Sequence, residues 1–322
     1  MYKTGSYRDT ALIFFDKVLK YLEPDELLQD EALWINEASF SALIWCEQYE
    51  GEIYKYDVKS LYPYLMQSST LKFPIRRGDF KKIDVINEYP EFGIYRCIIN
   101  KSEDVNTNKL FKFNYHNKYT NIDLTNTKKL GLTITMIQDN KPNFLHYSRD
   151  KLITFHEAFH LYVKHLFELK DMKGDEQEIK LLNTASKKIL NILWGALCEI
   201  NKIKKYADDY KMKIDDDEEI IEMRMYGDNI KCISYTIHTV KRSSYYKTRF
   251  ARLCPFLISQ GRKHMSDIML PYKEHIKHIQ TDGFTSTIKI HENKSVSIGE
   301  LKYEGYNMNG VIRNCNSKNV LF

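Results

Sequence analysis

The sequence predicts an α+β fold in which an antiparallel sheet packs against helices. Residues 52–58 alternate between apolar and polar side chains as a half-buried strand does, and residues 276–290 have the turn chemistry of a β-hairpin. Residues 150–171, 176–198 and 244–270 repeat apolar side chains at the spacing of one helix face. Together these strands and long helices predict the mixed fold.

The N-terminal half begins with helical periodicity over residues 8–35, which Pro24 divides into two helices. A short helix is expected directly after the strand at residues 52–58, with Pro63 in its first turn, where proline is tolerated. Residues 75–148 mix short strand-like runs with Asn, Lys, Thr and aromatic residues. We expect them to form a small inserted α+β segment.

The C-terminal half begins with the two longest helices, which are joined near Gly174. Residues 207–222 are strongly acidic and predict a solvated loop or helix face rather than a site. The hairpin at residues 276–290 is expected to turn at Asp282-Gly283, because this dipeptide suits a type I′ turn.

Composition is ordinary for a globular protein, with 43% apolar and 28% charged residues in 322. The net charge of +5 favours an anionic partner without proving one. The six cysteines show no C-x-x-C spacing, so they predict neither a zinc knuckle nor a redox pair but free thiols of a reducing compartment. No run approaches the roughly 20 apolar residues of a membrane span, so we expect an intracellular chain without a membrane partner.

A first chemical segment is DVKSLYP, residues 57–63, at the end of the predicted strand. A strand holds a carboxylate rigidly, so Asp57 could bind Mg²⁺ through oxygen. The backbone N–H groups of the following helix start suit a triphosphate. The alternative is a surface aspartate before a helix, with Tyr62 in the core.

A second segment is KKILNILWG, residues 187–195. Lys187, Asn191 and Trp194 follow the spacing that places side chains on one helix face. A lysine there can bind phosphates, while the asparagine and the aromatic ring can pack near a base. An ordinary amphipathic helix with an exposed lysine is the alternative.

A third segment is HIQTDG, residues 278–283, at the predicted hairpin tip. Its acidic residue is Asp282. Taken alone, the segment is equally typical of a plain Asp-Gly turn.

In this order the three segments resemble motifs A, B and C of family B DNA polymerases, whose patterns are DxxSLYP, KxxxNSxYG and YxDTDS. Asp57 and Lys187 are 130 residues apart, and Lys187 and Asp282 are 95 apart. These gaps resemble those of the protein-primed subgroup found in viruses, linear plasmids and mitochondrial elements, which carries one insertion between A and B and a smaller one between B and C. Residues 75–148 and roughly 205–240 would hold these insertions.

The resemblance implies a polymerase palm, a two-helix fingers region and an insertion that resembles a priming-protein region. Residues 1–74 would hold the N-terminal helices and the first palm segment, and residues 75–149 the insertion. Residues 150–205 would form the fingers, and residues 206–322 the second palm segment with the distal primer contact.

The implied function is the addition of dNTPs to a DNA or protein primer opposite a template strand. Asp57 and Asp282 would be catalytic and, with Val58, would hold two Mg²⁺ ions, which Mn²⁺ can replace. Tyr62 would lie under the sugar and exclude a ribose 2′-hydroxyl. Nucleotide-binding positions would be Ser60, Leu61, Tyr62, Lys173, Lys187, Asn191 and Trp194, and primer or DNA contacts would be Lys318, Ser41 and Thr281.

Several positions depart from the family pattern. Gln280 stands where motif C has its first carboxylate, and Ile192 and Trp194 replace the serine and tyrosine of motif B. Val320 replaces the tyrosine of the primer-contact pattern KxY, and Ser41-Ala42 replaces two glycines of a template contact. Gln280, Val320 and Ser41-Ala42, together with the expected absence of a thumb, favour the main alternative, a catalytically silent palm remnant that binds DNA or a partner polymerase subunit.

The two ends of the chain lead to a further expectation. Only 56 residues precede Asp57, which is too few for the 3′–5′ exonuclease domain of full-length relatives, and four residues follow Lys318, where a thumb would begin. We therefore expect a core without proofreading. Its expected partners are template-primer DNA, dNTPs, and either a terminal priming protein or a separate thumb and exonuclease chain, in infected cytoplasm, nucleus or mitochondrion.

One competing motif is HEAFH at residues 156–160, which matches the HExxH helix of zinc proteases. His156 and His160 would bind zinc, Glu157 would act as base, and Glu176 or Glu178 would supply a third ligand. The surrounding apolar spacing equally fits an ordinary amphipathic helix.

Overall fold

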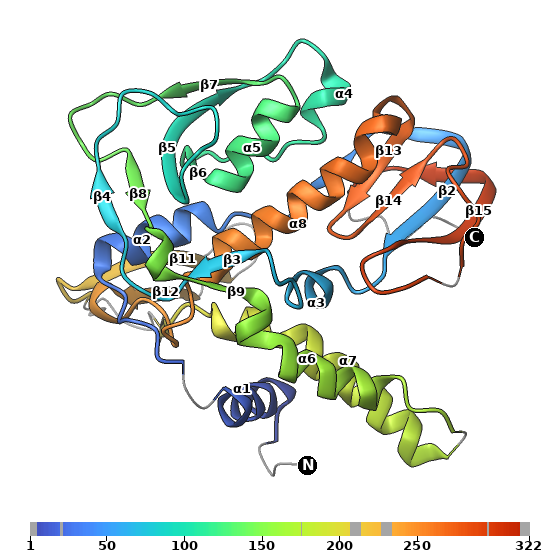
Figure 1. Ribbon diagram of the computed structural model, residues 1–322, viewed down its shortest axis with the longest axis horizontal. Helices are drawn as coiled ribbons and strands as arrows, with labels where there is room; N and C mark the ends of the chain where they lie inside the picture. The colour runs from blue at the N-terminus through green and yellow to red at the C-terminus, as the bar shows by residue number, and fades with distance from the viewer. Residues whose placement is uncertain are drawn as a thin grey trace.

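The computed structural model has a mixed α+β fold with antiparallel sheets, which confirms the fold class (Figure 1). No helix in its described part has the length and apolar character needed to cross a bilayer. The structure describes residues 5–19, 22–174, 176–206, 214–226, 234–294 and 296–315.

The central sheet has five strands in the order β1-β13-β14-β2-β15, and every neighbouring pair is antiparallel. Segments far apart in sequence therefore lie next to one another (Figure 1). The strands are β1 Ile44–Cys46, β2 Tyr49–Val58, β13 Ile276–Gln280, β14 Gly283–Ser286 and β15 Leu301–Ile312.

Strand β2 and the short helix α3, Leu61–Leu65, form where the sequence predicts them. Alternate residues of β2, among them Tyr56 and Val58, are buried in the core, as the period of a strand requires. Tyr56 stacks on Phe284 of β14 with ring centroids 5.4 Å apart. This packing fixes the end of β2 against the hairpin.

The hairpin predicted at residues 276–290 is present but ends at Ser286, and its turn lies one residue earlier than expected. Gln280 pairs with Gly283, so Thr281 and Asp282 form the turn. Thr281 takes the left-handed conformation with φ 58°. Gly283 instead begins β14, where a side chain would lie 3.0 Å from the Tyr56 carbonyl oxygen and 3.3 Å from Asp57 Oδ1. Close strand packing, not turn geometry, is therefore the reason for this glycine.

Helices α6, Phe155–Lys170, and α7, Gln177–Leu197, confirm the two predicted long helices and run side by side (Figure 1). The inner face of α7 is apolar and buried, with Leu190, Leu193 and Leu197 at most 2% exposed. Helix α1, Tyr7–Val18, packs against α7.

Helix α8, Leu253–Met269, begins later than the predicted start at residue 244. Pro255 lacks an N–H and is tolerated only in the first turn, which explains a start at Leu253. A short 3-10 turn, Arg242–Ser244, precedes it, and another, Leu270–His275, follows it. The buried ion pair between Arg252 and Glu31 joins α8 to α2, Gln29–Ala38.

The predicted insertion forms a separate sheet with its own apolar cluster, built around Tyr95, Phe111 and Phe144. Arg262 of α8 anchors it through a buried ion pair with Asp123. Its elements are β4 Asp79–Lys81, β5 Gly93–Asn100, α4 Val105–Asn108, β6 Lys118–Thr120, α5 Asn121–Lys129, β7 Thr133–Met136 and β8 Phe144–His146; the 3-10 turn Arg149–Lys151 follows, and β3 Lys72–Pro74 pairs with β9 Leu152–Thr154 at its base.

A third sheet follows α7, with strands β10 Lys202–Tyr206, β11 Glu218–Tyr226 and β12 Ser234–Lys241 in the order β10-β12-β11. The acidic stretch at residues 207–222 was expected to be a loop or helix face, but its last residues belong to β11. Glu218 is buried and ion-paired with Lys205, so this acidic residue faces a partner rather than solvent. Residues 207–213 lie outside the described part of the chain.

Candidate active site

A cavity of about 610 Å³ lies where the central sheet meets α3, α6 and α7. It gathers residues of all three chemical segments and of β15. Its lining includes Asp57, Lys59, Ser60, Leu61, Tyr62, Lys170, Lys187, Asn191, Trp194, Thr281, Asp282, Lys294, Lys302 and Glu304.

Two aspartates lie at the sheet end of this cavity. Asp57 is the penultimate residue of β2 and pairs with Gly283 of β14, so Asp282 is the next residue toward the turn. The N–H of Val58 donates to the carbonyl oxygen of Asp282 at 2.7 Å, which fixes the turn against the strand. Sheet register thus brings together two carboxylates that are far apart in the sequence.

The electrostatic surroundings disfavour ionisation of both aspartates. Burial, followed by the charges of Asp282 and Glu304, raises the pKa of Asp57 to about 7, although Lys302 and Lys55 oppose the shift. Burial and the charge of Glu304 also raise the pKa of Asp282. The protein alone therefore supplies too little positive charge to keep both carboxylates ionised, and a bound cation would stabilise their ionised form.

The donors present fit a hard divalent cation such as Mg²⁺, because carboxylate oxygen is its preferred protein ligand. In the described ranges no group of three His, Cys, Asp or Glu side chains is arranged around one metal position. Gln280 lies at the end of β13, where its side chain is exposed and does not line the cavity. Further oxygens would have to come from substrate or water. Val58 has a buried side chain and could offer only its backbone.

Lysines also line the cavity. Lys187 lies on α7, as predicted, and Lys59 follows β2. Lys170 of α6 donates to Ser60 Oγ at 3.3 Å, and burial lowers the pKa of its ammonium group. Lys173 was the expected second phosphate-binding residue, but it lies beyond the end of α6 and does not line the cavity.

Two residues of the cavity have strained backbones. Ser60, at the start of α3, and Thr281, in the hairpin turn, have φ values of 55° and 58°. Side chains other than glycine rarely adopt this left-handed region, at a cost of roughly 1–3 kcal/mol. The strain directs the chain sharply away from each aspartate and leaves both carboxylates at the cavity.

Aromatic rings form the floor of the cavity. Tyr62 of α3 packs against Trp194 of α7, with ring centroids 5.0 Å apart and planes tilted by 31°. Burial raises the pKa of Tyr62 to about 12, so its hydroxyl stays protonated at neutral pH. Asn191 lies one turn before Trp194 and also lines the cavity.

The expected DNA contacts are distributed differently. Thr281 lines the cavity beside Asp282. Ser41 does not, and its carbonyl oxygen accepts a hydrogen bond from Arg262 Nη1 at 3.2 Å. Lys318 and Val320 lie outside the described part of the chain.

Lys302 and Glu304 of β15 also line the cavity, although sequence reasoning assigned neither of them to the site. Lys302 is the register partner of Asp57 on the neighbouring strand. Its ammonium group lies 3.2 Å from Glu304 Oε1, and Lys55 lies 3.8 Å from the same carboxylate. Only the pairing of β15 with β2 reveals this group, and no local motif predicts that pairing.

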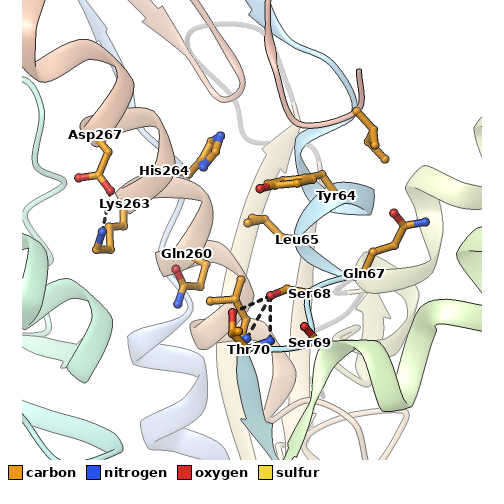
Figure 2. Close-up of a pocket in the computed structure, with 12 residues that line it drawn as sticks. Tyr64, Leu65, Gln67, Ser68, Ser69, Thr70, Gln260, Lys263, His264 and Asp267 are labelled. Carbon is orange, nitrogen blue, oxygen red and sulfur yellow. Dashed lines mark hydrogen bonds and ion pairs between the residues drawn. The ribbon is translucent and has the colours of Figure 1, made fainter. Parts of the chain in front are cut away.

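A second cavity, of about 490 Å³, borders α3 and α8 (Figure 2). Tyr64 and His264 face each other there, with ring centroids 5.7 Å apart. The carboxylate among its lining residues, Asp267, is already paired with Lys263 and Lys129. This cavity therefore does not offer the paired carboxylates found beside Asp57.

The HExxH segment forms the first turns of α6, but its groups are engaged in other contacts. Glu157 accepts hydrogen bonds from the backbone and hydroxyl of Thr154 and completes a capping box. The rings of His156 and His160 stack with centroids 4.3 Å apart, and His160 Nδ1 lies 2.8 Å from the His156 carbonyl oxygen. Within the described ranges no third ligand joins them, so the segment serves as a helix start.

Comparison with known proteins agrees with this geometry. The family described as DNA polymerase type B, organellar and viral, matches residues 42–286. The chain belongs to this family. This type B polymerase chain is also 26% identical, over 226 residues, to a DNA polymerase of Kluyveromyces lactis. The match covers 66% of this chain and 21% of that protein.

Solved structures of phi29 DNA polymerase share the fold of this polymerase chain. The complex with single-stranded DNA has a TM-score of 0.66 at 16% identity, and the complex with primer-template DNA has 0.65 at 16%. Each match covers 94% of this chain and 52% of the phi29 chain. The chain thus spans about half the length of the phi29 polymerase and about a fifth of the yeast protein.

Proposed function

We propose that this chain is a template-directed DNA polymerase core that joins a dNTP to a primer end. The observation that carries the proposal is the convergence of Asp57 and Asp282 in a cavity that lysines also line. Nucleotidyl transfer needs both features, because a cation must be held near the reacting phosphorus and negative charge must be neutralised on the leaving pyrophosphate. Family membership supports this assignment.

Each residue then has a role that follows from its position. Asp57 and Asp282 would hold the divalent ions, which supply Lewis acidity at the primer hydroxyl and the transferred phosphate. Lys187 and Lys170 would bind the outer phosphates of the nucleotide as point charges. Ser60 and Leu61, at the start of α3, would orient the triphosphate, while Asn191 and Trp194 would shape the base side of the pocket. Tyr62 would lie under the sugar.

Partners are proposed on the same basis. Structures of the phi29 polymerase contain primer-template DNA, and one also contains incoming nucleotides. We propose template-primer DNA and dNTPs as ligands of this chain, with a priming protein or a chain bearing thumb and exonuclease as a further partner. The net charge of +5 agrees with an anionic ligand.

The experiment is single-nucleotide extension of a primed template with Mg²⁺ or Mn²⁺. We expect extension by the intact chain and its loss in Asp282→Ala, because one carboxylate cannot hold the ions that two hold. Extension that persists unchanged in Asp282→Ala would contradict the assignment of this cavity.

The second candidate is a silent palm that binds DNA or a partner subunit, and Gln280 is the observation that favours it. Gln280→Asp restores a carboxylate to the hairpin and discriminates between the two. A polymerase of reduced activity predicts faster extension in this variant than in the intact chain. A silent palm predicts no extension by the intact chain, with DNA binding retained.

A further inference from the structure

The side chain of Tyr62 contacts two further helices. The Trp194 ring of α7 lies 5.0 Å from the Tyr62 ring, measured between centroids. Gly261 of α8 lies next to the phenol and leaves space for it. A Cβ built at this glycine would lie 3.2 Å from Tyr62 Cε1, 3.3 Å from its hydroxyl oxygen and 3.4 Å from Cζ. A side chain at residue 261 would therefore press on the phenol and shift it slightly.

Packing is what fixes this ring. Among the residues that the structure describes, none forms a hydrogen bond with the hydroxyl of Tyr62, a residue that lines the cavity. Helix α3 is only five residues long, so its own backbone restrains the ring weakly. The position of the phenol must then follow from its two neighbours, Trp194 and Gly261.

We propose that Gly261 and Trp194 are positioning residues that set how strongly the site discriminates between deoxyribonucleotides and ribonucleotides, and that both act through Tyr62. The inference rests on the proposed polymerase function, in which Tyr62 lies under the sugar. It extends that function to α8, a helix that holds none of the three polymerase motifs.

Substitutions at Gly261 and Trp194 should change the preference for deoxyribonucleotides in opposite directions. A methyl group at residue 261 must displace the phenol by a few tenths of an ångström, and the space open to the ring is the cavity. The sugar site becomes narrower, so a ribose 2′-hydroxyl is rejected more strongly. Loss of the indole at residue 194 removes the other support, and the ring can then yield to the 2′-hydroxyl.

The experiment measures the preference for dATP over ATP on a primed template in two ways. One is the ratio of kcat/KM values with Mg²⁺, and the other is the ratio of Kd values with Ca²⁺, which requires no turnover. Gly261→Ala is expected to raise the preference about tenfold, the lower end of what one methylene group changes in a packed pocket. Trp194→Ala is expected to lower it by a similar factor, and Trp194→Phe, which keeps an aromatic ring, by less.

A double-variant cycle tests the route through Tyr62. In a Tyr62→Ala background, Gly261→Ala should leave the preference unchanged, because no phenol remains to be displaced. Lys263→Ala, which changes α8 at the second cavity, is the control and should match the intact chain. Alanine suits a helix interior better than glycine, so Gly261→Ala should fold.

The outcomes separate this inference from the proposed function. If the intact chain extends primers but Gly261→Ala has the same dATP preference, the inference is wrong and the polymerase assignment stands. An equal effect of Gly261→Ala with and without Tyr62 would also overturn it. If the chain does not extend primers, the Kd ratios still decide whether residue 261 controls sugar selection.

Discussion

Asp57 and Asp282 are the residues on which the site depends, and both are placed at an energetic cost. Their carboxylates are partly buried near each other and near Glu304, and left-handed residues stand close to each in the chain. Such a site is less stable than an uncharged one until a cation binds. This cost is understandable where binding of a cation is the purpose of the site.

Asp57→Asn tests this cost. Because folding raises the pKa of Asp57 to about 7 from an ordinary value of 3.8, the protonated form stabilises the folded chain. That stability is fully present below about pH 4 and is lost as the pH rises through 7. At pH 8 without metal, Asp57→Asn should therefore raise Tm by about 3 °C, and at pH 4 it should have no effect.

Thermal unfolding at the two pH values measures this effect. Asp16→Asn, a change at an exposed aspartate of α1, is the control and should leave Tm unchanged at both. A lower Tm for Asp57→Asn at pH 8 would show that the carboxylate is stabilising and would contradict the account.

Lys170 and Lys173 offer a second test at the level of single residues, namely which of the two lysines binds the nucleotide phosphates. Lys170 lines the cavity and Lys173 does not, although both are basic residues near the end of α6. Lys170→Ala should raise the KM for dNTP about tenfold by removing one charge-assisted phosphate contact. Lys173→Ala should leave KM unchanged. Steady-state nucleotide titration measures both, and the reverse order of effects would favour the sequence-based assignment of Lys173.

Elements whose signal is local could be predicted from the sequence. The end of β2, the start of α3 and the polar face of α7 follow from alternation, a proline and helical spacing over a few residues. The start of α8 was wrong by nine residues, because apolar spacing continued upstream of Pro255. The turn at Thr281 and the side chains of β15 depend on register between distant strands, which a single sequence does not show. Similarly, Cys46 and Cys315 looked unrelated in sequence, yet their Sγ atoms lie 2.9 Å apart.

At the scale of elements, the ion pair that joins α8 to the insertion should contribute strongly to the stability of the chain. Arg262 and Asp123 are 3% and 4% exposed, and Arg262 Nη2 lies 2.9 Å from Asp123 Oδ1. Asp123→Ala leaves a buried guanidinium without its counter-charge and should destabilise the chain by about 3–5 kcal/mol. Lys129 joins the same two helices through Asp267 at the surface, so Lys129→Ala should cost about 1 kcal/mol or less. Urea denaturation measures the unfolding free energy of both variants. Equal losses would contradict the conclusion that burial makes the Arg262–Asp123 pair the more important of the two.

At the scale of the whole molecule, the cavity is a product of long-range assembly. Its residues come from the central sheet, α3, α6 and α7, which span the chain from Asp57 to Glu304. The insertion and the three-stranded sheet each have strands of their own and leave the cavity to the remaining elements. The division into palm, fingers and insertion, with boundaries at residues 74, 149 and 205, remains a prediction of the family resemblance.

The central claim is that a template directs nucleotide choice in this cavity. Four primed templates that differ only in the first unpaired base test it directly, each offered the four dNTPs separately with Mn²⁺. The complementary dNTP should be added preferentially on every template, and Asp282→Ala should add none. Addition of one nucleotide irrespective of template, or no addition on any template, would contradict it.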